Sequence, residues 1–134
     1  MANEAVVVEL LGDQGDVIEY TVASGTTIAK CTLLQLADER TASASDGENV
    51  FAGIASTEKD GSDYSTTLGA YTYGVFDLVS ADDTISVGAI VSLSGANLVK
   101  TATEAEIAAG KGIGKALETA SNGETFQVLV GRCC

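Results

Sequence analysis

The stretch Gly110–Leu117, with the sequence GKGIGKAL, is the part of the chain that most resembles a phosphate-binding loop. A P-loop requires the pattern GxxxxGK[ST], in which the final hydroxyl holds Mg²⁺. Here Ala116 follows Gly114 and Lys115, and Ala109 stands where the first glycine belongs. A dinucleotide-binding loop has another glycine spacing and precedes a helix. We therefore expect these glycines to start a strand that lies close to another backbone.

Other residues with catalytic or metal-binding potential are few, because the 134-residue chain contains no histidine. Without histidine, no Ser-His-Asp or Cys-His arrangement can form within one chain, and zinc sites lose a common ligand. The acidic pairs Asp82/Asp83 and Glu104/Glu106 lack the loop pattern of a Ca²⁺ site, and we interpret them as solvated turns. The sequence predicts no enzyme, no catalytic residue, no metal and no cofactor. A hydrolase or another enzyme built on carboxylates or lysine is the alternative that the composition leaves open.

The chain has three cysteines, Cys31, Cys133 and Cys134. An odd number without regular spacing does not form a disulfide framework. Cys31 lies in the apolar run IAKCTLLQL, which predicts a small buried side chain. The terminal pair has three interpretations: a cross-link between neighbouring chains, a metal site shared with a partner, or tail residues without a role.

Charge restricts the possible partners. The 19 acidic and 7 basic residues give a formal net charge of −12. Such a surface repels the phosphates of nucleic acids and the headgroups of anionic lipids, so we predict neither a nucleic-acid nor a membrane partner. The N-terminal MANEAVVVELLGD has an acid where a signal peptide needs a basic residue, and its apolar run is too short to span a bilayer. We expect synthesis in a cytoplasm.

Short β-branched or aromatic segments alternate with turn clusters along the chain. The clusters GDQGD, SASDGEN, EKDGSD and ASNGE contain the residue types that favour turns. This pattern predicts an all-β fold, a small barrel or sandwich of about seven short strands. The expected strands are 4–11, 16–23, 29–37, 50–56, 70–80, 89–95 and 125–131.

One segment, TEAEIAAGK (103–111), departs from the strand pattern. Thr103 and Glu106 have the spacing of a capping box, and Gly110 is a suitable helix stop. The segment predicts one short helical turn, with a loop rich in threonine and alanine as the alternative.

Two parts of the chain also echo each other. TTIAKCTLLQL followed by AGIAS resembles ISVGAIVSLSG followed by IGKALET. A polar excursion separates the two segments in each part, and an apolar strand follows, YGVFDLVS in the first and FQVLVG in the second. The echo indicates either two related halves folded over one core or only the residue pattern that antiparallel strands and their turns have in common.

The order of these segments carries a resemblance to a known family. An acidic N-terminal arm precedes GTTIAKCTLLQL, VFAGIAS, AYTYGVFDL, ISVGAIVSLSG and GKGIGKALETASNGETFQVLV. This order resembles the small capsid decoration, or cement, proteins of tailed bacteriophages and related viruses, over roughly residues 24–131. The best match is GKALETASNGETFQVLV, with its glycine-rich strand start, its turn and its final strand of valine and leucine.

The resemblance implies a structural protein that lies on the outer capsid surface of the virion after synthesis in the host cytoplasm. Such proteins clamp adjacent subunits of the major capsid protein, commonly as trimers. The implied partners are therefore the major capsid protein and further copies of this chain, in a homotrimer. Two terminal cysteines, Cys133 and Cys134, are candidates for a cross-link between subunits.

The resemblance further implies an N-terminal arm, 1–15, ahead of a single β decoration domain, 16–134. Arms of this kind contact the capsid or a neighbouring chain by adding a strand to it. An ordinary central strand is the alternative, because three valines in a row suit burial on both faces. The predicted contact residues of the arm are Val6, Val7, Val8, Leu10 and Leu11.

Two other functions stay open. One is a different virion component, such as a head fibre base or a tail part. The other is a small non-viral β-barrel binding module, although the absence of tryptophan disfavours sugar binding. A binding module needs a concave site within one chain, whereas a decoration protein needs surfaces that other chains cover.

Overall fold

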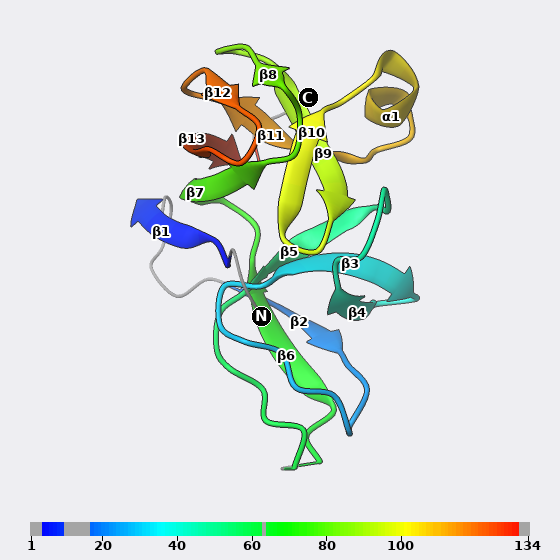
Figure 1. Cartoon of the computed structure of the whole chain (residues 1–134). Coiled ribbons are helices and arrows are strands. Elements are labelled where there is room, and N and C mark those ends of the chain that lie inside the picture. The colour runs from blue at the N-terminus through cyan, green and yellow to red at the C-terminus, as the bar shows by residue number, and fades with distance from the viewer. Residues whose placement is uncertain (1–3, 10–16, 63, 132–134) are drawn as a thin grey trace.

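A computed structural model describes residues 4–9, 17–62 and 64–131 of the chain. Figure 1 shows the strands in two groups, with strands β2 to β6 below and strands β7 to β13 above. Each group forms a closed barrel of five strands, and β1 lies beside the upper barrel.

The first barrel closes in the strand order β2-β4-β3-β5-β6. All its pairs are antiparallel except β2 with β4. Its strands are β2 (Ile18–Thr21), β3 (Leu33–Asp38), β4 (Thr41–Ala44), β5 (Phe51–Ala55) and β6 (Thr67–Tyr71).

The second barrel belongs to a sheet of order β1-β7-β10-β9-β11-β13, which closes because β13 also pairs with β7. The sixth strand, β1 (Val6–Glu9), pairs antiparallel with β7 outside the ring. Two further short strands, β8 and β12, pair with each other. The strands are β7 (Gly74–Ser80), β8 (Thr84–Ile85), β9 (Ile90–Gly95), β10 (Leu98–Thr101), β11 (Gly112–Ala116), β12 (Ala120–Ser121) and β13 (Thr125–Val130).

The two barrels have the same connections. In the first barrel β3 and β4 form a hairpin, β4 runs parallel to β2, β3 pairs with β5, and β6 joins β5 to β2. In the second barrel, β9, β10, β7, β11 and β13 repeat these pairings in the same order. The bridge between Ile28 and Lys59 is repeated by the β8–β12 pair. We call residues at the same place in the two barrels counterparts.

Backbone hydrogen bonds define the counterparts residue by residue. The Cys31 N–H donates to the Ala55 carbonyl at 2.8 Å, and the Gly88 N–H donates to the Ala116 carbonyl at 2.7 Å. Cys31 and Gly88 are both in the left-handed region, with φ of 67° and 88°. The echo in the sequence therefore corresponds to two related halves. The last part of the echo is wrong, because the counterpart of β13 is β6 and not the segment YGVFDLVS.

Each barrel has its own core, contrary to the single core that the echo suggested. Side chains alternate along the strands, so that Phe126, Val128 and Val130 of β13 are buried while the residues between them are half-buried. The core of the second barrel also includes Leu33 and Ile54, which come from the first barrel. The core of the first barrel consists of Val22, Ile28, Leu34, Ala42, Ala52, Ala55, Leu68 and Ala70.

The barrels meet where the tip of the β9–β10 hairpin rests on the first barrel. Asn97 at this tip is fully buried, and its Oδ1 accepts a hydrogen bond from the Leu33 N–H at 2.8 Å. The Asn97 N–H donates to Ser45 Oγ at 3.0 Å. Both bonds satisfy backbone groups that are cut off from water, which ties the two barrels together.

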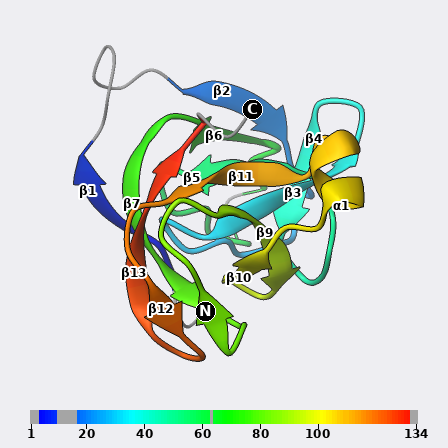
Figure 2. The same ribbon diagram turned by 90° about the horizontal axis from the view of Figure 1, so that it is seen from above.

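The helix α1 (Glu104–Ala108) follows β10, at one side of the molecule (Figure 2). The Glu106 N–H donates to Thr103 Oγ1, and the Thr103 N–H donates to Glu106 Oε1, which confirms the predicted capping box. Gly110 has φ of 79° directly after the helix, as a helix stop requires. Among the described residues, no helix is long and apolar enough to cross a membrane.

The prediction of an all-β fold with one helical turn is confirmed. The described residues contain thirteen strands rather than about seven. The expected strand 70–80 is interrupted at Thr72–Tyr73 and forms parts of both β6 and β7. Strands β4, β8, β10 and β12 are two to four residues long and too short for an alternation pattern to reveal. The predicted boundary between an arm and a domain, at residues 15 and 16, lies within the undescribed segment 10–16 and stays a prediction.

A candidate interaction surface

The stretch that resembled a phosphate-binding loop is a strand, as we predicted. Residues 112–116 form β11, which pairs with β9 and β13, and the helix precedes this strand instead of following it. Gly114 lies so close to β13 that a Cβ atom there would collide with the carbonyl of Leu129. The glycine is thus needed for close approach of two backbones.

One residue of each acidic pair bonds to the backbone, and Glu106 is buried rather than solvated as we interpreted it. Asp82 accepts a hydrogen bond from the Thr101 N–H at 2.8 Å. Glu106 is 9 % exposed and forms an ion pair with Lys100, at 3.0 Å between Oε2 and Nζ. The hydrogen bond from the Thr103 backbone, together with Lys100, holds the pKa of Glu106 below its ordinary value in spite of burial. Within residues 4–9, 17–62 and 64–131, no three acidic or cysteine side chains lie together as a metal site would require.

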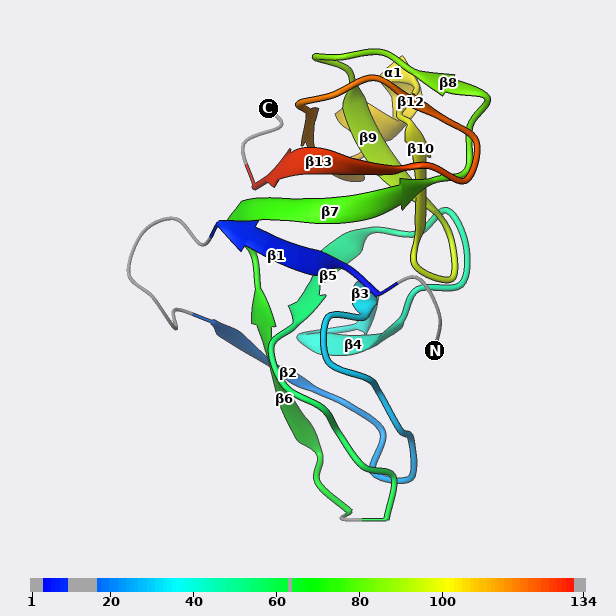
Figure 3. The same cartoon turned by 60° about the vertical axis from the view of Figure 1, so that its left-hand side comes forward.

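The arm forms a strand on its own chain before the undescribed segment begins. Figure 3 shows β1 beside β7, with β13 on the other side of β7. Val6 pairs with Asp77 and Val7 with Phe76, and the register shifts by a bulge before Glu9. Because β1 is the last strand of its sheet, its outer edge offers backbone groups to which a further strand can bind.

The side chains of β1 are unusually apolar for an edge strand. Val6, Val7 and Val8 are 56 %, 36 % and 39 % exposed. The preceding Ala5 is buried, and its N–H donates to the Cys31 carbonyl at 2.8 Å, which anchors the strand. A row of exposed valines on an open strand edge is suited to contact with another protein. The predicted contact residues Leu10 and Leu11 lie outside the described residues.

The cysteines are not brought together among the described residues. Cys31 is only half-buried, and its side chain packs against the larger core. Burial raises the pKa of the Cys31 thiol and Glu4 acts in the same direction, while Lys30 opposes them. Cys133 and Cys134 lie outside the described residues, so their cross-link stays a prediction.

A second group of exposed apolar side chains was missed by the sequence reasoning. This group lies on the first barrel and consists of Val17, directly before β2, Ile18 in β2 and Leu36 in β3. Each of these side chains is about 40 % exposed. The segments that contain them have the same strand-like pattern as buried strands, so their exposure could not be predicted. The echo between the two halves gave no signal either, because each of the three has an apolar counterpart in the second barrel that is buried.

Comparisons with known proteins identify the family. The pattern of the family described as phage cement protein matches residues 12–132. The fold is similar to that of the crystal structure of the head fiber gp8.5 N base in bacteriophage phi29, with a TM-score of 0.55 and 14 % sequence identity. That similarity covers 88 % of this chain and 97 % of the other. No curated protein matches the sequence. The match to the family extends over most of the chain, and the chain belongs to the phage cement protein family.

Proposed function

We propose that this protein binds the outer surface of a phage capsid and stabilises the shell by clamping adjacent subunits of the major capsid protein. The observation that carries the proposal is the family match over residues 12–132. Membership makes the chain a structural component of the phage virion, and a cement protein is not an enzyme class. We propose in addition that the chain clamps neighbouring subunits, that its partner is the major capsid protein, and that it is a homotrimer on the capsid.

The open edge of β1 supports a contact of this kind. Its backbone can pair with a strand of a capsid subunit, while Val6 and Val8 fill apolar pockets beside it. Binding through a single strand is weak, but the capsid lattice repeats the site many times. Several contacts per oligomer then act together, so that the bound protein dissociates slowly.

The roles of the candidate residues in the described part of the chain also suit a clamp. The glycine-rich stretch is a strand, and the acidic residues Asp82 and Glu106 are engaged in backbone hydrogen bonds. What the described part of the chain offers is stiff β structure with two cores and exposed apolar edges. We propose that the protein has no catalytic activity.

A second candidate is the base of a head fibre. It is favoured by the similarity in fold to the head fiber gp8.5 N base, which this chain matches over nearly the whole length of that structure. A fibre base and a clamp both need a surface that binds the capsid. They differ in copy number, because a lattice-wide clamp approaches one copy per capsid subunit, whereas a fibre base has no such requirement.

The first test is the copy number of the chain in purified particles, measured by quantitative mass spectrometry against the major capsid protein. A ratio near one-to-one supports a lattice-wide clamp. A clearly lower but constant ratio favours the fibre base. Absence from particles contradicts both capsid functions.

The second test concerns β1. Purified protein is added to capsids that lack it, and bound protein is measured after sedimentation, together with the temperature at which the capsids break. We expect Val6→Asp and Val8→Asp to weaken binding and to lower the breaking temperature toward that of bare capsids. Tyr64→Asn is the matched control, because it removes a 78 % exposed apolar side chain from a loop of the first barrel. Normal binding by both valine variants would refute the role of β1.

A further inference from the structure

The junction between the two barrels buries one end of the second barrel. Val75, Phe76 and Leu93 at this end are 8 %, 0 % and 0 % exposed. Phe76 and Leu93 share a core cluster with Leu33 of the first barrel. Phe76 also faces Tyr71 of the first barrel, with 6.0 Å between the ring centroids. These residues make up the inserted half of the junction.

The same end of the first barrel is exposed. The register of β2 with β6 matches that of β7 with β13, and the register of the β3–β4 hairpin matches that of the β9–β10 hairpin. These registers make Val17, Ile18 and Leu36 the counterparts of Val75, Phe76 and Leu93. The counterparts of Val75, Phe76 and Leu93 are 40 %, 39 % and 40 % exposed, which leaves an apolar end of a barrel uncovered. We call this surface the open end; it consists of Val17, Ile18 and Leu36.

The receiving half of the junction also has a counterpart, which no barrel of the same chain covers and which is less buried. On the first barrel, Leu33 and Ile54 are fully buried beneath the second barrel. On the second barrel, the counterpart of Leu33 is Ile90, which is half-buried, and the counterpart of Ile54 is Lys115, which is exposed. The counterpart of Tyr71 is Leu129, which is half-buried. We call this surface the open face; it consists of Ile90, Lys115 and Leu129.

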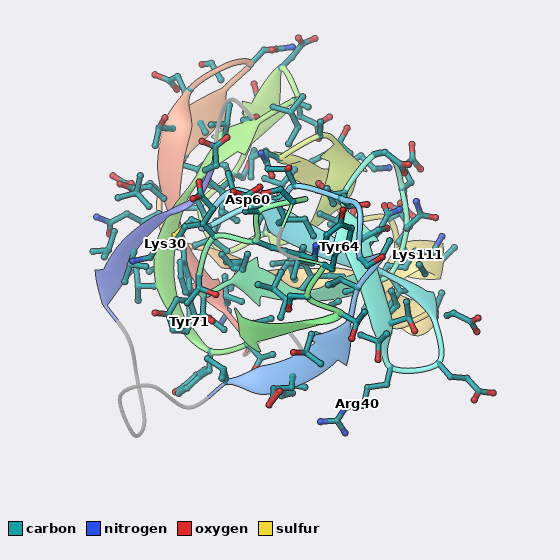
Figure 4. The ribbon with its side chains drawn as sticks, turned by 90° about the horizontal axis from the view of Figure 1, so that it is seen from below. Lys30, Arg40, Asp60, Tyr64, Tyr71 and Lys111 are labelled. Atoms are coloured by element: carbon teal, nitrogen blue, oxygen red, sulfur yellow. The ribbon has the colours of Figure 1, made fainter. Side chains whose placement is uncertain are left out.

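The hairpin tips complete the correspondence. Asn97, whose side chain and backbone bond to the first barrel, has Arg40 as its counterpart, and both have positive φ, 58° and 44°. Figure 4 shows Arg40 at the outside of the molecule, where it is exposed and its Nε–H donates to the Glu19 carbonyl of its own barrel at 3.0 Å. The counterpart of Ser45, which receives Asn97, is Ala102, two residues before the exposed carboxylate Glu104. A cationic tip placed at the open face would meet both the Glu104 carboxylate and the Lys115 ammonium, so the correspondence rests on the repeated contacts and not on charge.

We propose that a second copy of this chain places the open end of its first barrel on the open face of the second barrel, and so repeats between molecules the junction that joins the barrels within one molecule. Both surfaces lie on one chain, so each copy offers what the next copy needs. The proposal specifies the interface of the homo-oligomer proposed above and rests on that part of the proposed function; capsid binding is not required. Such a head-to-tail contact forms a closed ring if the rotation between copies closes, as a trimer requires.

Cross-linking of purified protein without capsids tests the proposed contact. Ile18 and Leu129 are the counterparts of Phe76 and Tyr71, which face each other in the junction. Two variants, Ile18→Cys and Leu129→Cys, are prepared in a background of Cys31→Gly, Cys133→Ser and Cys134→Ser. The glycine suits the left-handed φ of residue 31. The variants are treated with a short bismaleimide, separately and as a mixture.

We expect a covalent dimer from the mixture and little from either variant alone, because the two surfaces are different. A protein with both cysteines should give a closed oligomer or a ladder. Adding Leu36→Asp to the Ile18→Cys protein should lower the dimer yield about tenfold or more, since it replaces a buried apolar contact by a charge. Tyr64→Asn in the same protein is the matched control and should leave the yield unchanged.

Equal dimer yields from the mixture and from the separate variants, or no dimer at high protein concentration, would overturn the proposed interface. Capsid binding of Leu36→Asp is measured in parallel. Unimpaired self-association with lost capsid binding would instead assign the open end to the capsid and also overturn the inference. Lost capsid binding by the β1 variants alone concerns the clamp and leaves the interface intact, so that failures of the two proposals are distinguishable.

Discussion

Replacing Asn97 tests whether hydrogen bonds at the barrel junction stabilise the whole molecule. Two substitutions separate two effects. Asn97→Gly removes the side chain that accepts from the Leu33 N–H, while glycine tolerates the φ of 58°. Asn97→Ala removes the same acceptor and in addition places a Cβ in the left-handed region.

The magnitudes follow from the burial of the site. Leu33 and Asn97 are both 0 % exposed, so the N–H of Leu33 has no water to replace its lost acceptor. A buried N–H without a partner costs about 1–3 kcal/mol. The left-handed conformation costs alanine roughly 1–2 kcal/mol more. We expect the free energy of unfolding to fall by about 1–3 kcal/mol in Asn97→Gly and by about 2–5 kcal/mol in Asn97→Ala.

Equilibrium unfolding in urea, followed by far-ultraviolet circular dichroism, measures these losses. Arg40→Gly is the matched control, because Arg40 occupies the same turn position in the exposed hairpin; it removes only a solvent-exposed hydrogen bond to the Glu19 carbonyl and should change stability by less than about 1 kcal/mol. If both Asn97 variants unfold like the wild type, the junction does not depend on these hydrogen bonds. Equal losses in the two Asn97 variants would refute the contribution of the backbone conformation.

Three further changes test single features of the fold. Glu106→Gln should lower stability at neutral pH by about 0.5–1 kcal/mol, because it removes the ion pair with Lys100 while glutamine can still accept the hydrogen bond of the capping box. The folded pKa of Glu106 lies below its ordinary value of 4.5, so the contribution of its charge is present above that pH and is lost as the pH falls through the folded pKa; thermal melts of wild type and variant should therefore converge in acid. Gly114→Ala should prevent stable folding, because its Cβ meets the Leu129 carbonyl, whereas Gly25→Ala, with open space around its Cβ, should melt like the wild type. Lys59→Met should cost about 2–4 kcal/mol in urea unfolding, because the buried Lys59 amine donates to two backbone carbonyls that methionine leaves without a donor; a loss below about 0.5 kcal/mol would show that these carbonyls find other partners.

Local pattern was sufficient for those features that depend on neighbouring residues. The capping box of Thr103 and Glu106 was predicted because its two hydrogen bonds join residues three positions apart. The strand character of 112–116 followed from the failure of every loop motif and from glycines that suit close backbones. The number of strands was underestimated, because strands of two to four residues leave no alternation to recognise.

The composition and the order of apolar segments were also enough for the all-β class and for the resemblance to capsid cement proteins, which the family match confirms. They could not assign the interaction surface. The valines of β1 read equally well as an arm, as an edge strand or as a central strand, and only the position of β1 outside the barrel decides that their side chains are exposed.

The strongest example is the pair Leu36 and Leu93. They are identical residues at the same position of the same strand in two barrels of one design, yet Leu36 is 40 % exposed and Leu93 is fully buried. Periodicity predicts which side of a strand is apolar, because it follows from the alternation of side chains. It carries no information on whether another barrel lies against the end of that strand. Burial at this level depends on contacts between segments far apart in the chain, and so it required the folded structure.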